Sequence, residues 1–68
     1  MAERLYAIRL VVDNMTINEV GHSGENALSA FEDAVDQGVL SVPYGFMGHV
    51  VVLREDGLVL RFELGYAD

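Results

Sequence analysis

The sequence predicts an α+β protein in the order ββαββ, with one helix packed on one face of a four-stranded antiparallel sheet. Three observations lead to this prediction. Apolar side chains follow strand-like patterns along four segments of the chain. A central segment instead has apolar residues at helical spacing. Turn-forming pairs separate the first two and the last two strand-like segments, so each pair of segments is expected to form a hairpin.

The first hairpin is expected near the N-terminus. Residues Glu3 to Val12 read as a strand with one apolar face made by Tyr6, Ile8, Leu10 and Val12. Asp13 and Asn14 follow, and both tolerate turn geometry. Met15 to Val20 then reads as a shorter second strand, and the glycine-rich stretch from Gly21 to Gly24 reads as a loop.

The helix is predicted over Glu25 to Gln37. Ser23 or Gly24 is suited to cap its start, and Gly38 stands where a helix ends in a left-handed residue. The expected apolar stripe consists of Ala27, Leu28, Phe31, Ala34 and Val35.

A connection rich in Pro and Gly is expected from Val39 to Gly48. It carries Tyr44, Phe46 and Met47, so parts of this connection are expected to pack on the core. His49 to Arg54 and Leu58 to Leu64 read as the last two strands. Asp56-Gly57 between them is a strong signal for a tight hairpin turn.

The helix can bury its stripe only against the sheet. The expected core residues are Tyr6, Ile8, Leu10, Val12, Leu28, Phe31, Val35, Val51, Leu53, Leu60, Phe62 and Leu64. The opposite sheet face is expected to carry Leu5, Arg9, Val11, Val50, Val52, Arg54, Val59 and Arg61. Its valines indicate either an interface or strand propensity alone, with arginine stems covering them.

Length and composition set the class. The 68 residues are read as one acidic α+β domain, 1–68, and the 51% hydrophobic content suffices for one core. The chain has no cysteine, which excludes disulfides, thiolate nucleophiles and cysteine-bound zinc and suits a reducing cytoplasm. No apolar run is long enough to span a membrane, and the first five residues do not resemble a signal peptide.

Catalytic signals are weak, so we expect a protein that is not an enzyme and has no cofactor or metal. The run from Gly21 to Glu25 lacks the last glycine of a nucleophile elbow, and Ser23 fits a helix cap instead. His22 and His49 have no partner at metal-ligand spacing. A small enzyme subunit that uses one of these histidines stays an alternative.

Charge is the more informative property. Eleven acidic and four basic residues give a net charge of −7, which repels nucleic acid and anionic membranes. A partner selected by charge would be basic, whereas the plain alternative is that acidity serves solubility. No basic residue occurs between Arg9 and Arg54.

The predicted helix concentrates acidic residues on its outer side. Glu32 and Asp36 lie one turn apart and near the helix C-terminus, where anions are unfavourable, so local stability does not explain them. Four acids would span about 16 Å, a charge density similar to one DNA strand with a phosphate every ~3.4 Å. The main candidate partner-binding residues are Glu25, Glu32, Asp33 and Asp36, and the secondary candidates are Asp13, Glu19, Glu55 and Asp56.

The strand Leu5 to Val12, the acidic helix Glu25 to Gln37 and the hairpin His49 to Leu64 together resemble, in architecture and charge, small phage-encoded anti-CRISPR proteins. The nearest resemblance is to acidic inhibitors of type I surveillance complexes. The resemblance implies binding to a basic Cas subunit in the bacterial cytoplasm and blockade of target DNA recognition. It carries no motif, so no family residue transfers to this chain. The alternative function is a structural or adaptor module that self-associates through the valine-rich sheet face, and both monomer and homodimer stay open.

Overall fold

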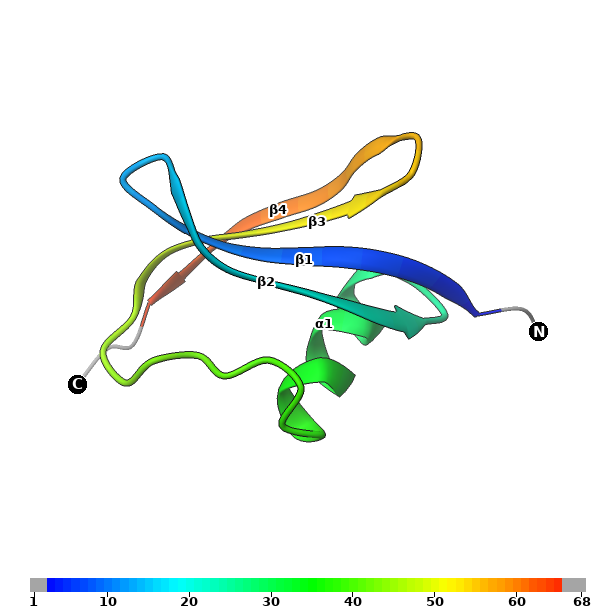
Figure 1. Cartoon of the computed structure of the whole chain (residues 1–68), viewed down its shortest axis with the longest axis horizontal. Helices are drawn as coiled ribbons and strands as arrows, with labels where there is room; N and C mark the ends of the chain where they lie inside the picture. The colour runs from blue at the N-terminus through cyan, green and yellow to red at the C-terminus, as the bar shows by residue number, and fades with distance from the viewer. Residues whose placement is uncertain (1–2, 66–68) are drawn as a thin grey trace.

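The computed structural model describes residues 3–65, in which a four-stranded antiparallel sheet carries one helix on one face (Figure 1). The elements are β1 (Arg4–Val12), β2 (Met15–Gly24), α1 (Ala27–Asp36), β3 (Met47–Arg54) and β4 (Gly57–Gly65). The strands lie in the order β2-β1-β3-β4, so the two hairpins meet through β1 and β3. This arrangement confirms the predicted ββαββ fold.

The first hairpin confirms the predicted turn but extends its second strand. Asp13 and Asn14 have φ values of 52° and 63°, the left-handed pair that a two-residue hairpin turn requires. Strand β2 continues to Gly24, so the prediction of a loop from Gly21 was wrong. Residues 21–24 pair with residues 4–7 of β1, because the long β1 offers an edge and backbone pairing there outweighs the weak strand propensity of glycine.

Strand β3 has the opposite orientation from the prediction. Val50 and Val52 are fully buried under the helix, whereas Val51 and Leu53 are half-buried on the other face of the sheet. The run of three valines and a leucine has no apolar alternation, so sequence periodicity could not choose between the two faces. Pairing with β1 determines which face of β3 is buried. Val52 lies opposite Ile8 and Val50 opposite Leu10, and residues directly opposite each other share a face.

The helix is shorter than predicted and rotated about its axis. It begins at Ala27, and Asn26 rather than Ser23 or Gly24 is its N-cap, whose Oδ1 accepts a 2.9 Å hydrogen bond from the Ser29 N–H. The buried side is made by Ala27, Ala30 and Ala34. The predicted core residues Leu28 and Val35 are 49% and 38% exposed. Small side chains face the sheet because the backbone of β2 comes too close for larger ones.

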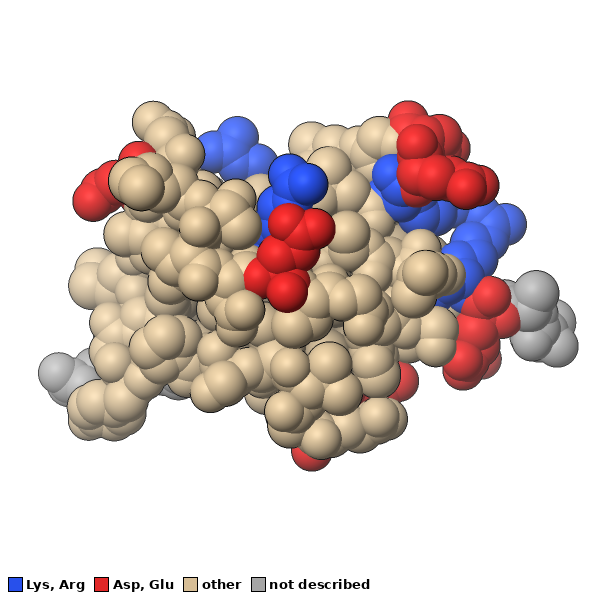
Figure 2. Space-filling model, in the orientation of Figure 1, with Lys and Arg blue, Asp and Glu red and all other residues tan. Residues whose placement is uncertain are grey.

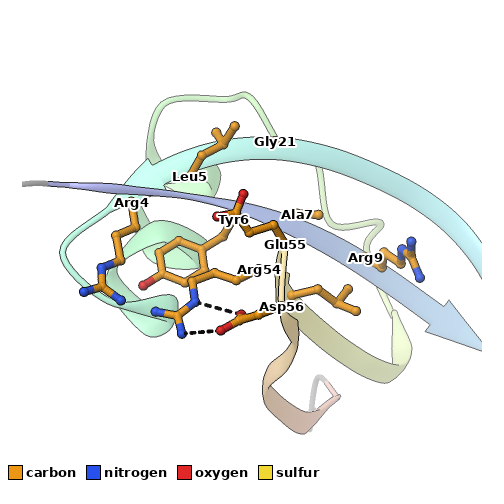
Figure 3. A pocket seen from close by; sticks show the side chains of 10 residues that line it. Arg4, Leu5, Tyr6, Ala7, Arg9, Gly21, Arg54, Glu55 and Asp56 are labelled. Carbon is orange, nitrogen blue, oxygen red and sulfur yellow. Dashed lines mark hydrogen bonds and ion pairs between the residues drawn. The ribbon is translucent and has the colours of Figure 1, made fainter.

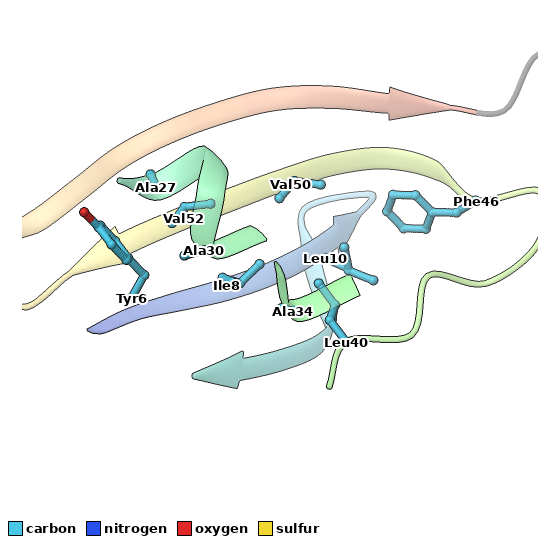
Figure 4. Close-up of a cluster of buried hydrophobic side chains, with 10 residues drawn as sticks. All are labelled: Tyr6, Ile8, Leu10, Ala27, Ala30, Ala34, Leu40, Phe46, Val50 and Val52. Carbon is cyan, nitrogen blue, oxygen red and sulfur yellow. The ribbon is translucent and has the colours of Figure 1, made fainter. Parts of the chain in front are cut away.

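The connection from 37 to 46 completes the core. Leu40 is buried, and Phe46 is buried at the end that leads into β3, whereas Tyr44 and Met47 are exposed. Gly38 has φ 75°, as expected for the residue that ends the helix. The complete buried cluster, drawn in Figure 4, contains Tyr6, Ile8, Leu10, Ala27, Ala30, Ala34, Leu40, Phe46, Val50 and Val52.

The second hairpin turns one residue earlier than predicted. Glu55 and Asp56 form the turn, and Gly57 pairs with Arg54 with a φ of 128°. The pairing of β3 with β4 is irregular between Val52 and Leu53. The predicted core residues Val12, Phe31, Leu60, Phe62 and Leu64 are partly buried against the buried cluster.

Candidate functional site

The acidic side of α1 is held in place by the contact between helix and sheet. A Cβ built on Gly24 would lie 2.7 Å from the Ala30 amide nitrogen and 2.8 Å from its Cα, so the end of β2 touches the helix backbone directly. Ala27, Ala30 and Ala34 present no long side chain on this side. The rotation of α1 is therefore fixed by close packing, and its outer side is fixed with it.

Two carboxylates lie opposite the buried alanines. At about 100° per residue, Glu32 and Asp36 lie on the outer side of the helix, with Asp33 on its flank. All three are exposed. Glu25 precedes the N-cap and does not continue this line, so the predicted four-acid row is wrong. The acids on α1 extend about 6 Å along its axis instead of about 16 Å, which covers roughly two DNA phosphate spacings.

An apolar hollow adjoins these acids. It is lined by Phe31, Val35, Val42 and Leu64, with Glu32 and Asp36 at its border. The exposed Leu28 belongs to the same flank of the helix. The sequence prediction missed this mixed surface because it placed Leu28 and Val35 in the core. The spacing of Ala27, Ala30 and Ala34 was the signal for the alternative rotation.

Two of the secondary candidates are engaged by arginines of the same chain. Arg9 Nε donates a 3.0 Å hydrogen bond to Glu19, and Arg54 donates two hydrogen bonds of 3.3 and 3.2 Å to Asp56. Asp13 and Glu55 are exposed in the two hairpin turns. Within residues 3–65, no ion pair involves Glu25, Glu32, Asp33 or Asp36. The helix acids therefore keep their charge uncompensated, whereas Glu19 and Asp56 do not.

Charge is divided between the helix and the strands. All four arginines belong to strands, and α1 has no basic residue. In Figure 2 the blue atoms lie over the sheet and beside red atoms, whereas the red atoms at the lower edge, toward the helix side, have no blue neighbours. The charged residues of α1 are thus all acidic, whereas the strands carry charges of both signs.

A cleft lies at the other end of the sheet, between the start of β1 and the turn of the second hairpin. Arg4, Tyr6, Arg54 and Asp56 are among the residues that line it (Figure 3). The hydrogen bonds and charge of Asp56 raise the pKa of Arg54, and Arg54 in turn lowers the pKa of Asp56. The charges of Arg54 and Asp56 therefore neutralise each other within the cleft.

Both histidines lie in strands, and each faces a residue of the neighbouring strand. His22 lies in β2 opposite Tyr6 rather than in a loop. His49 lies opposite Glu63, with 3.7 Å between His49 Nε2 and a Glu63 carboxylate oxygen. Among residues 3–65, no three His, Asp or Glu side chains gather in a way that could hold a metal ion. The helix present in the same range is too short and too polar to cross a membrane.

The fold and surface define a small α+β protein with an exposed acidic helix on one side of a four-stranded sheet. Comparison with known proteins found no matching family model, no matching curated protein and no matching solved structure.

Proposed function

We propose that this chain is an acidic binding protein that docks the outer side of α1 on a basic, nucleic-acid-binding surface of another protein and competes with nucleic acid there. The observation that carries the proposal is that Glu32, Asp33 and Asp36 are exposed on a helix with no basic residue and no ion pair in the described structure. Their placement lowers the stability of the free chain, because Glu32 and Asp36 repel each other near a helix C-terminus.

The hollow beside the acids gives the docking surface a chemical preference. Lysine and arginine side chains bury their aliphatic stems on apolar surface and keep the charged head outside. Phe31, Val35 and Val42 supply such a surface, and Glu32 and Asp36 border it. A basic side chain of the partner can therefore place its stem in the hollow and its charge beside two carboxylates.

The partner class follows from charge, and its identity is a narrower proposal. A protein surface built to hold phosphates is rich in Arg and Lys, and it attracts carboxylates for the same electrostatic reason. The anti-CRISPR resemblance names a DNA-binding subunit of a type I surveillance complex as the specific partner. It rests on architecture and charge.

The test uses immobilised chain to capture proteins from a bacterial lysate and then measures the captured partner by titration. Binding should weaken as salt rises, and duplex DNA should displace the partner. The double substitution Glu32→Lys with Asp36→Lys should reduce affinity at least about 30-fold, since each of the two desolvated charged pairs contributes roughly 1–3 kcal/mol and every 1.4 kcal/mol is about tenfold.

A matched control makes the same change in net charge at positions outside α1. The pair Glu3→Lys with Glu55→Lys shifts the net charge equally and leaves α1 untouched. Equal losses from the two double variants would assign binding to net charge and contradict the helix-face mechanism. A captured partner that DNA cannot displace would contradict competition with nucleic acid.

A second candidate function is self-association through the sheet face opposite the helix. In the described residues no element covers this face (Figure 1), and its apolar residues are Leu5, Val11, Val51, Leu53 and Leu58. Val50 and Val52, predicted for this face, lie beneath the helix instead. Val51→Glu should dissociate such an assembly at any salt concentration, and a monomeric parent chain would contradict it.

A further inference from the structure

Strand β4 forms an edge of the sheet and is poorly covered by the helix. It neighbours β3 only, so its outer edge offers unpaired backbone N–H and C=O groups. The helix contacts β2 more than any other strand. None of the ten buried residues comes from β4, as Figure 4 shows, and its helix-side residues Leu60, Phe62 and Leu64 are half-buried.

This edge is also only partly protected against pairing. Natural edge strands are often short or interrupted by Pro, Lys or a bulge. Strand β4 has nine residues without Pro or Lys. Its irregular pairing with β3 lies at Leu58 to Leu60, near the turn, and leaves residues 60–65 in regular register.

We propose that this edge of β4 pairs antiparallel with β4 of a second copy of the chain, centred on Phe62. Such a contact is isologous, and it joins two four-stranded sheets into one sheet of eight strands. Phe62 lies opposite the partner's Phe62, and Leu60 lies opposite the partner's Leu64. The half-buried apolar residues of the two copies then cover one another on the helix side.

Charge complementarity selects this register. With Phe62 at the two-fold axis, Arg61 lies opposite the partner's Glu63, and Glu63 lies opposite the partner's Arg61. Opposite charges directly across from each other are favourable in a sheet, and like charges are unfavourable. Moving the centre to Arg61 or to Glu63 would set like charges face to face.

In the single chain, the residues of this contact are already in position and available. Phe62 packs edge-to-face against Phe31, with 5.4 Å between ring centroids and 78° between ring planes, so its position is fixed before pairing. Arg61 is exposed and makes no ion pair in residues 3–65, and the contact of Glu63 with His49 is 3.7 Å long. Both charged groups are therefore available to the second copy.

The assembly would place both helices on the same side, because its two-fold axis is perpendicular to the sheet. Two acidic helix faces would then point in one direction. A partner with two basic sites could bind both at once, which raises the apparent affinity without any new contact. This consequence rests on the proposed function, whereas the pairing of β4 does not.

The experiment measures the solution mass of the full chain by sedimentation over a range of concentrations. The parent chain is expected to form a dimer. Arg61→Glu and Glu63→Arg, each alone, should weaken dimerisation roughly tenfold or more, since each places like charges opposite each other at two positions. The double variant Arg61→Glu with Glu63→Arg should restore dimerisation to within a few-fold. The controls Arg4→Glu and Glu55→Arg make the same charge changes outside β4 and should leave it unchanged.

A cross-linking measurement tests the register without dependence on charge. The chain has no cysteine, so Arg61→Cys and Glu63→Cys can be made separately. A mixture of the two variants should form an intermolecular disulfide faster than either variant alone. Any of three results would overturn the proposal. The parent chain could stay monomeric at all concentrations, the dimer could be unaffected by both charge reversals, or cross-linking could be equal in all samples.

Failure here and failure of the proposed function are separable. Dissociation by Val51→Glu with no effect of Arg61→Glu would assign self-association to the open sheet face and reject the β4 edge. The helix variants at Glu32 and Asp36 are read from partner binding and leave the dimer measurement unaffected. Circular dichroism of each variant verifies that the fold is retained.

Discussion

Replacing Gly24 by alanine is the sharpest test of how the helix is held on the sheet. The added Cβ would lie 2.7 Å from the Ala30 nitrogen, 2.8 Å from its Cα and 3.0 Å from its Cβ. Carbon contacts are favourable from about 3.5 Å, so the two backbones must separate by roughly 0.8 Å. Ala30 is part of the helix, and no flexible side chain can move aside to relieve the contact.

The expected cost can be compared with the stability of the whole chain. Overpacking of a core typically costs about 1–3 kcal/mol. A chain of this length has a free energy of unfolding of roughly 3–10 kcal/mol. Gly24→Ala should therefore remove about 2–3 kcal/mol, a large share of the total, because separation of α1 from β2 also loosens the packing of Ala27 and Ala34.

Urea denaturation followed by circular dichroism measures this loss, with Gly21→Ala as the matched control. Gly21 lies in the same strand, and its nearest contacts to an added Cβ are 3.9 Å away. The control should change the free energy of unfolding by no more than about 0.5 kcal/mol. Equal denaturation midpoints for the two variants would refute the close contact between β2 and α1.

Four further predictions concern single residues. Asn26→Ala should lower the free energy of unfolding by about 1 kcal/mol, because it removes the cap that accepts the Ser29 N–H; denaturation measures it, and an unchanged midpoint would contradict the cap. Leu40→Ala should cost about 2–5 kcal/mol in the same assay, since Leu40 is 1% exposed, and a loss below about 1 kcal/mol would contradict its core position. Asp36→Lys should stabilise the free chain by about 0.5–1 kcal/mol by relieving repulsion near the helix C-terminus while weakening partner binding, and a loss of stability would contradict this account. Arg54 lowers the pKa of folded Asp56, so the stability that this group contributes is present above its unfolded pKa of about 3.9 and is lost as pH falls through the folded pKa. Asp56→Asn should therefore flatten the acid denaturation profile in this range. An unchanged profile would exclude the Arg54–Asp56 pair as a source of the pH dependence.

The sequence by itself determined the element types and the hairpins. In β1, the two-residue period of a strand placed Tyr6, Ile8 and Leu10 together on one face and Arg9 on the other, and the first three are buried. The Asp13-Asn14 pair specified its turn through local backbone preferences. These features depend on neighbouring residues along the chain, so local physical chemistry is sufficient to predict them.

The acidic character of the helix was also readable from the sequence, but its extent was not. Glu32, Asp33 and Asp36 lie on α1 as predicted and are exposed. Glu25 lies before the helix, because the N-cap is Asn26, rather than Ser23 or Gly24, and its side chain accepts the Ser29 N–H. Helix propensity does not determine which of several neighbouring residues caps the helix. Here β2 continues to Gly24, so the cap falls after it, at Asn26.

The tertiary structure alone decided the faces of β3 and α1. The apolar run from Val50 to Leu53 fits either orientation, and only its pairing with Ile8 and Leu10 buried Val50 and Val52. On α1, the alanines form one side and Leu28 and Val35 form another. Both sets recur at helical spacing, so the sequence pattern allows either side to face the sheet. The close approach of Gly24 left room only for alanines, which turned Leu28 and Val35 outward beside the acids. Contacts between segments distant in sequence set both choices, so periodicity within one segment could not reveal them.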